Sequence, residues 1–207
     1  EQQNVPSLRF PEFEGEWSSH KLSEAWQVKG QRNRDSVYGK EHVLSVSGEY
    51  GVINQIELLG RSYAGVSVLD YHVVDTGDIV YTKSPLKTNP YGIIKANLGP
   101  SGIVSTLYAV YKVSPEHSSK YWNAYFCLDD RTNKYLLPLV HKGAKNDMKI
   151  NNDRVLIDPV SSPTLSEQRK IAEFLEAMDE RIAQVTRKKA LLEDYKKGCM
   201  QQLFSQS

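Results

Sequence analysis

Basic side chains gather in three segments of the chain, and clustered lysines and arginines are what proteins use to hold phosphate groups. The segments span residues 27–40, 83–95 and 142–149, and the second contains Lys83, Lys87 and Lys95 without any acid. If the fold brings the three together, they form one phosphate-facing surface. The alternative is three unrelated solvated loops, and the formal net charge of +1 does not decide between the two.

The motifs that carry catalytic chemistry are missing from the sequence. It contains no nucleophile elbow (G-x-S-x-G), no Walker phosphate loop and no G-x-G-x-x-G. The string Asn89-Pro90-Tyr91-Gly92 is similar to the Asn-Pro-Pro-Tyr/Phe motif of adenine methyltransferases, but it lacks the second proline and an upstream cofactor loop. A turn is the better interpretation of this string, and the pair Asp129-Asp130 falls on an expected helix surface. The sequence therefore indicates binding and not catalysis.

Histidine and cysteine usage argues against a metal site or a disulfide. The five histidines are scattered without metal-ligand spacing, and Cys127 and Cys199 lie far apart. We expect a reducing, cytoplasmic compartment, and no apolar run is long enough to cross a membrane. The sequence opens on Glu1 without a methionine, so we expect a trimmed or excised form.

Between residues 42 and 113 the pattern is typical of a compact, mainly antiparallel β-structure. Short β-branched and aromatic runs alternate there with Gly, Pro and Asn. Strands are predicted at 43–46, 51–53, 66–69, 71–74, 79–82, 92–94 and 104–111, of which the last is the longest. Turn residues at 75–78 and 97–102 support this prediction.

The flanking segments add helices and one more strand, which makes the expected fold class α+β. The proline-rich stretch 5–17 is expected to be extended and pinned to the core by its apolar residues, Leu8, Phe10, Phe13 and Trp17. Helices are predicted at 21–28 and 119–140, a strand at 155–157, and a linker between Pro159 and Pro163. The expected domains are residues 1–160 and 161–207.

The second of these is a single long helix from Ser166 to Phe204, with Ser166 as its N-cap. A heptad seam runs along it, with eight apolar members: Ile171, Leu175, Met178, Ile182, Val185, Leu192, Cys199 and Leu203. A narrow seam over five heptads predicts a coiled coil with a partner helix. Lys189 and Lys196 fill the other two seam positions, and they favour an antiparallel partner whose N-terminal half presents acids.

Four stretches of the sequence carry a resemblance to a known family. VPSLRFPEFEGEW at 5–17, followed by Lys21-Leu22, resembles the usual entry to a target recognition domain in the specificity (S) subunits of type I restriction–modification systems. Residues 73–84 are similar to that family's central strand-turn-strand element. Residues 163–175 with 179–182, and the ending at 195–204, resemble its conserved-region helix. The resemblance covers nearly the whole chain and is least specific in the recognition loops.

The resemblance implies a non-catalytic subunit that reads half of a bipartite site in double-stranded DNA. Long helices of the family space the two halves and dock methyltransferase (M) subunits. Cofactors are expected on the partners only: S-adenosylmethionine on M subunits, and ATP with Mg²⁺ on restriction (R) subunits. A complete S subunit has two recognition domains, whereas this sequence has one. We therefore expect either an excised half or a short S subunit that works as a homodimer.

Reading of bases requires donors and acceptors on a rigid scaffold, with cations on phosphates. The candidate DNA-binding residues are Arg32, Arg34, Lys83, Ser84, Lys87, Asn89, Tyr91, Lys142, Lys145 and Asn146. Lys83 is the best single candidate, while a turn role for Asn89 is at least as good an interpretation. The alternative function is an interaction or scaffold protein whose helix docks on a larger assembly without DNA reading. The recognised bases cannot be deduced from the sequence.

Overall fold

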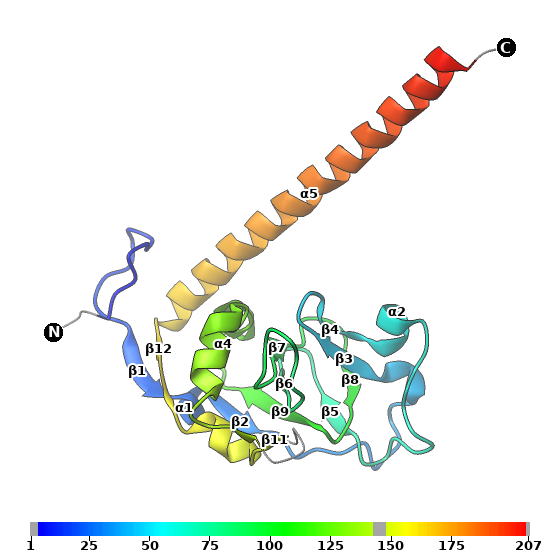
Figure 1. Cartoon of the computed structure of the whole chain (residues 1–207). Coiled ribbons are helices and arrows are strands. Elements are labelled where there is room, and N and C mark those ends of the chain that lie inside the picture. The colour runs from blue at the N-terminus through cyan, green and yellow to red at the C-terminus, as the bar shows by residue number, and fades with distance from the viewer. Residues whose placement is uncertain (1–3, 143–147, 206–207) are drawn as a thin grey trace. The chain divides into compact units, whose positions relative to one another are not determined.

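The computed structural model describes residues 4–142 and 148–205, and the chain divides into two compact units, Glu1–Arg169 and Lys170–Ser207 (Figure 1). The first unit is built around an antiparallel four-stranded sheet with the order β2-β9-β6-β7. Its strands are β2 (Trp26–Val28), β9 (Tyr108–Val113), β6 (Ile79–Thr82) and β7 (Ile94–Ala96). All four residues of β6 are buried, so both faces of the sheet are covered.

One face of the sheet packs against two pairs of short strands. These are the hairpin of β3 (Leu44–Ser47) and β4 (Gly51–Asn54), and the antiparallel pair of β5 (His72–Val74) and β8 (Gly102–Val104). Val80 and Val110 of the sheet share a buried cluster with Leu44, Val74 and Val104. Because successive side chains of a strand point to opposite faces, every second side chain of these strands points into this common core.

Helices α3 (Ser119–Tyr125) and α4 (Asp129–Leu136) contribute a second, aromatic core. The ring of Trp122 lies 5.6 Å from that of Trp26, and the ring of Trp26 lies 5.8 Å from that of Tyr111 (centroid distances). Phe126, at the end of α3, lies 5.6 Å from Trp26. Such edge and tilted arrangements are the favoured geometries for aromatic pairs, and these large side chains supply much of the buried apolar surface.

Short elements complete the first unit. They are β1 (Ser18–Lys21), α1 (Leu22–Ala25), the 3-10 helix η1 (Lys40–His42), α2 (Gln55–Leu59), β10 (His141–Lys142), β11 (Met148–Lys149), the 3-10 helix η2 (Asn152–Leu156) and β12 (Pro159–Ser162). Strands β1 and β12 pair antiparallel, with Ser18 opposite Ser162. This pairing brings the start of the chain beside the segment that leads into α5 (Leu165–Phe204).

Polar contacts hold the N-terminal segment to the first turn of α5. Arg9 donates two hydrogen bonds of 2.8 Å to the carboxylate of Glu167, which is 1% exposed. The indole of Trp17 donates to the same carboxylate at 3.3 Å. Asn4 donates to Trp17 O at 2.6 Å and to Ser161 Oγ at 2.9 Å. We call the group of Arg9, Trp17 and Glu167 the N-terminal clamp.

A second buried contact fixes the following residue. Gln168 is fully buried and accepts from Ser118 N at 2.9 Å, while its amide nitrogen donates to Pro163 O at 2.9 Å. The same nitrogen lies 3.1 Å from Nδ1 of His117. Glu167 and Gln168 are therefore positioned by opposite neighbours, the N-terminal segment and the start of α3.

Within the second unit, α5 exposes most of its seam, and apolar residues off the seam are exposed as well: Phe174, Leu191, Tyr195, Met200 and Phe204. Leu175, Met178, Ile182, Val185, Leu192 and Leu203 are between 40% and 76% exposed. Ile171 and Cys199 have intermediate exposure. The seam predicted from the sequence is therefore largely uncovered in this chain.

The prediction of an α+β fold with a long C-terminal helix is confirmed, with four local corrections among the strands. Residues 66–69 form a loop and not a strand. The predicted strand 104–111 is divided by a turn in which Tyr108 N donates to Ser105 O at 3.0 Å. The predicted strand 155–157 is instead the end of η2 and the residue after it. The predicted linker forms strand β12, because its backbone pairs with β1.

The helix predictions also require corrections. Only residues 22–25 of the predicted helix 21–28 are helical, and 26–28 form β2. The predicted helix 119–140 is two helices, because the chain turns at Phe126, whose carbonyl accepts from Thr132 Oγ1 at 2.8 Å. Helix α5 begins at Leu165, so the residue at its N-cap position is Thr164 and not the predicted Ser166. The carbonyl of Thr164 accepts a hydrogen bond from Gln168 N at 2.9 Å. Leu8 is 85% exposed, so the clamp, and not Leu8, holds the N-terminal segment.

Candidate nucleic-acid interface

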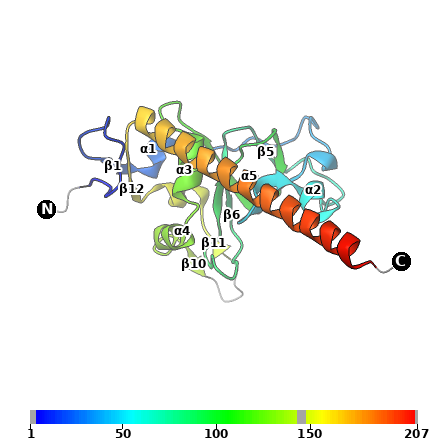
Figure 2. The same cartoon turned by 90° about the horizontal axis from the view of Figure 1, so that it is seen from above.

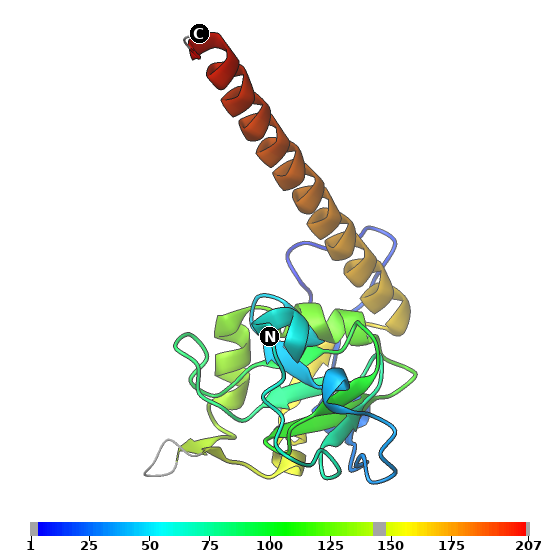
Figure 3. The same cartoon turned by 90° about the vertical axis from the view of Figure 1, so that its right-hand side faces the viewer.

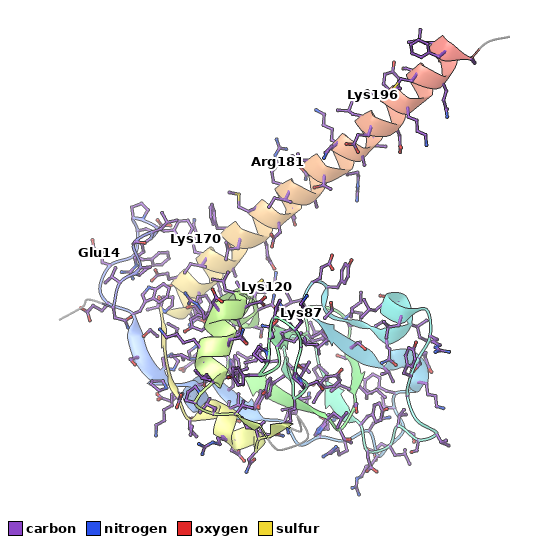
Figure 4. The ribbon with its side chains drawn as sticks, viewed as in Figure 1. Glu14, Lys87, Lys120, Lys170, Arg181 and Lys196 are labelled. Carbon is purple, nitrogen blue, oxygen red and sulfur yellow. The ribbon has the colours of Figure 1, made fainter. Side chains whose placement is uncertain are left out.

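The second basic segment forms the connection between β6 and β7. Lys83 is half-buried at the end of β6, and burial lowers the pKa of its ammonium group. Ser84 and Lys87 are exposed, and Figure 4 labels Lys87 together with Lys120 of α3, another exposed lysine. Lys95 is 6% exposed, and its ammonium nitrogen lies 3.9 Å from the sulfur of Cys127. The lysines of this segment that solvent can reach are therefore Lys83 and Lys87.

The string 89–92 is a turn, as its composition predicted. Leu86 N and Gly92 N both donate to Asn89 O at 3.0 Å. The buried side chain of Asn89 donates to Asp129 at 3.0 Å and accepts from Thr88 Oγ1 at 3.0 Å. Gly92 has a φ of +88°, and a Cβ there would lie 2.0 Å from Thr82 O, so only glycine fits. The amide of Asn89 is thus occupied within the protein, and it holds this connection against α4.

The first basic segment lies beside the loop that follows α2. Arg32 donates to Asp70 O at 2.6 Å, and Arg34 lies 3.7 Å from the carboxylate of Asp70. Both members of the second pair are more than 70% exposed, so this ion pair contributes little and leaves the guanidinium of Arg34 accessible. Lys29, by contrast, is enclosed by Asp75 and Asp78 at 2.7 and 2.5 Å.

His72 connects the first and second segments. It pairs with Arg32 through an isolated antiparallel bridge, and it is 5% exposed. Burial, and then the charges of Arg32 and Lys83, lower the pKa of His72 to about 4. Its imidazole is therefore neutral at neutral pH. Arg32 and Lys83, which lie far apart in sequence, are thus close enough to the same ring for their charges to act on it.

The third segment is described only in part. Lys142 is in β10, opposite Met148 of β11, and Lys145 and Asn146 lie outside the described residues. In Figures 2 and 3 the pair β10–β11 projects from the same side of the first unit as the segment after β6. The segment before η1, which carries Arg32 and Arg34, lies on the other side. Among the described residues, the first and second basic segments nevertheless approach each other at His72, through Arg32 and Lys83.

One exposed region, the loop 60–71, lies outside the three basic segments and was not predicted as part of the site. Its Tyr63, Val66 and Leu69 are 58%, 99% and 43% exposed, and Arg61 stacks over the Tyr63 ring at 4.6 Å. Within residues 4–142 and 148–205, no group of three or more His, Cys, Asp or Glu side chains could hold a metal ion. In the same residues, no helix is long and apolar enough to span a membrane.

No protein-family model and no curated protein matches the chain. Solved structures do match. The HsdS subunit from Thermoanaerobacter tengcongensis is 15% identical, with a TM-score of 0.58 over 95% of this chain and 49% of that one. The type I restriction-modification system S subunit from M. genitalium is 14% identical, with a TM-score of 0.54 over 93% of this chain and 46% of that one.

A third match comes from a structure that concerns complex assembly and conformational transition of the type I R-M system. It is 17% identical, with a TM-score of 0.58 over 97% of this chain and 50% of that one. At these identities the comparisons show the fold, which is that of an S subunit. The chain spans about half the length of the structures it matches.

Proposed function

We propose that the chain is a non-catalytic DNA sequence-specificity subunit of a type I restriction–modification complex. The observation that carries this proposal is the S-subunit-like fold, which extends over at least 93% of the chain and includes the long helix. The sequence segments that resemble the family independently favour it. In this proposal the first unit reads half of a bipartite site in double-stranded DNA.

Contacts to phosphate are assigned to exposed or half-buried cations of the first unit. Arg32 and Lys83 are the strongest candidates, because the charges of both act on His72 from separate parts of the chain. Arg32 forms a β-bridge with His72, and Lys83 directly follows β6. Further proposed contacts come from Arg34, Ser84, Lys87, Tyr91 and Lys142, and from Lys145 and Asn146 outside the described residues. Asn89 is assigned to the turn, because its amide is already hydrogen-bonded.

The proposed role of α5 is to pair with an antiparallel copy of itself. Pairing would cover the exposed seam, and it would hold two recognition domains at a fixed spacing on a palindromic bipartite site. The charged outer surface of the pair would dock M subunits carrying S-adenosylmethionine, and R subunits would bring ATP and Mg²⁺. This chain itself would hold no cofactor.

The test of this function is genetic and biochemical. Deletion of the chain should abolish methylation at one bipartite motif in the methylome of its host, and the purified chain should copurify with a methyltransferase. A methylation pattern that stays unchanged after deletion would refute the specificity role. It would favour the alternative, in which α5 docks the chain on an assembly and the first unit reads no DNA.

Lys83→Ala is expected to weaken binding of the full chain to duplex DNA almost equally for all sequences. Removal of one phosphate contact should lower the slope of log affinity against log salt by about 1. Titrations at several salt concentrations measure this, with the exposed Lys112 of β9, replaced by alanine, as the matched control. An unaltered affinity and slope would reject Lys83 as a phosphate contact.

A further inference from the structure

The loop 60–71 has no strand or helix, yet its start is fixed to the domain. The side-chain oxygen of Gln55 accepts from Tyr63 N at 2.6 Å and from Ser62 Oγ at 3.4 Å. The side-chain nitrogen of Gln55 donates to Ser45 Oγ of β3 at 3.1 Å. One carboxamide therefore ties the loop to the β3–β4 hairpin.

The end of the loop is fixed to the first basic segment. Asn33, which is 2% exposed, donates to Val68 O at 3.3 Å and to Tyr38 O at 2.8 Å, and its backbone N–H donates to Tyr71 O at 3.0 Å. Arg32 donates to Asp70 O. Residues 30–40 and 60–71 are thus joined into one surface, which we call the arginine–tyrosine surface.

The side chains of the loop divide into an inward and an outward set. Ala64, Val68 and Tyr71 pack against the buried cluster of Val43, Val73 and Ile103. Tyr63, Val66 and Leu69 face solvent, and Val66 is 99% exposed. Val37 of the neighbouring segment is also 70% exposed. A fixed scaffold that presents several apolar side chains to water is a mark of a contact surface.

The charge of this surface favours a nucleic acid as the occupant. Its two stretches hold four cations (Arg32, Arg34, Lys40 and Arg61) against the acids Asp35 and Asp70, a formal net charge of +2. Arg61 lies 4.6 Å from the centroid of the Tyr63 ring, so a guanidinium stands directly beside the apolar groups. In duplex DNA the thymine methyl group is the apolar feature of the major groove, and arginine is the common partner of guanine and phosphate.

We propose that the arginine–tyrosine surface contacts base edges of duplex DNA, with Tyr63 and Val66 in apolar contact with the groove and Arg61 beside them. The inference rests on the proposed function and adds the residues that determine specificity. Arg32 stands at the edge of the same surface, so its phosphate contact would orient the duplex. The loop's hydrogen bonds to Gln55 and Asn33 would hold the reading side chains in place without a helix in the groove.

The experiment selects duplexes from a random-sequence pool with the full chain and with its Tyr63→Ala/Val66→Ala variant. Wild type should enrich one sequence. The variant should bind that duplex roughly tenfold more weakly and relax at least one base position, while its affinity for mixed-sequence DNA changes less than about twofold. The matched control is Tyr50→Ala/Leu107→Ala, two exposed side chains (59% and 67%) in the β3–β4 and β8–β9 turns. This control should keep the wild-type selection.

The possible outcomes distinguish a failure of this inference from a failure of the proposed function. If wild type enriches a sequence and the variant enriches the same one with equal affinity, the surface does not read bases and the proposed function stands. If wild type enriches nothing, the proposed function and this inference both fail. If the variant keeps its DNA selection but loses a copurified protein, the surface is a protein interface and the inference is overturned.

Discussion

Arg9→Met is expected to destabilise the first unit strongly. It removes the arginine that donates hydrogen bonds to both oxygens of the buried carboxylate of Glu167. The side chain of Glu167 is 2% exposed, and after the change only the indole of Trp17 would hydrogen-bond to its carboxylate. A carboxylate left buried without its cation costs on the order of 3 kcal/mol. Thermal unfolding followed by circular dichroism should show a melting temperature lower by roughly 6–12 °C.

Two variants distinguish this explanation from a general loss of arginine. Arg169→Met removes an exposed arginine two residues from Glu167, and it should change the melting temperature little. The double variant Arg9→Met/Glu167→Met removes both charges, so it should be more stable than Arg9→Met alone. A double variant as unstable as the single one would show that packing of the Arg9 stem, and not its charge, holds the segment.

The clamp gives a physical reason for two of the family-like stretches. Arg9 belongs to the stretch 5–17 and Glu167 to the stretch 163–175, and they are 158 residues apart in sequence. Composition alone assigned Leu8 and the aromatic residues of the stretch 5–17 to the core. The partner of a charged residue across such a distance cannot be deduced from local pattern, because it depends on the β1–β12 pairing.

The elements that were predicted well are those whose pattern is long or clearly punctuated. The helix was predicted to within one residue of its observed start, because five heptads agree. Strand β6 was predicted at its observed bounds, since Asp75-Thr76-Gly77-Asp78 marks the turn before it. The run 104–111 misled the prediction because its turn, at Ser105–Leu107, contains neither glycine nor proline. There the hydroxyl of Ser105 accepts from Leu107 N at 3.4 Å and supports the turn.

Charge identified only part of the candidate site. It pointed to Arg32 and Lys83, which the fold brings close enough to His72 for both charges to lower its pKa. It also pointed to Lys29 and Lys95, which the fold encloses. The loop 60–71 carries a single arginine, and Val66–Leu69 gave the appearance of a strand. Its outward apolar residues became a candidate only when the inward set was seen to pack on Val43, Val73 and Ile103.

Ile182→Asp/Val185→Asp is expected to abolish self-association of the chain, which sedimentation should detect in wild type as a dimer. Both side chains are more than half exposed and lie on the seam of α5. Each is represented twice in a homodimer, and a buried aliphatic side chain contributes about 1.5–3 kcal/mol. The dissociation constant should therefore rise by at least about 1,000-fold. The control Ala183→Asp places a single aspartate off the seam and should leave the dimer intact.

The direction of pairing can be tested with a native side chain of the seam. In a parallel dimer the two Cys199 residues would face each other, and mild oxidation would join them by a disulfide. In the antiparallel dimer they lie at opposite ends of the pair, and Lys189 and Lys196 face the partner's acidic half. We therefore expect no Cys199 crosslink from a Cys127→Ser chain, which lacks the exposed second thiol. A rapid, complete crosslink in that chain would instead require parallel helices, which would place both recognition domains at the same end of the spacer.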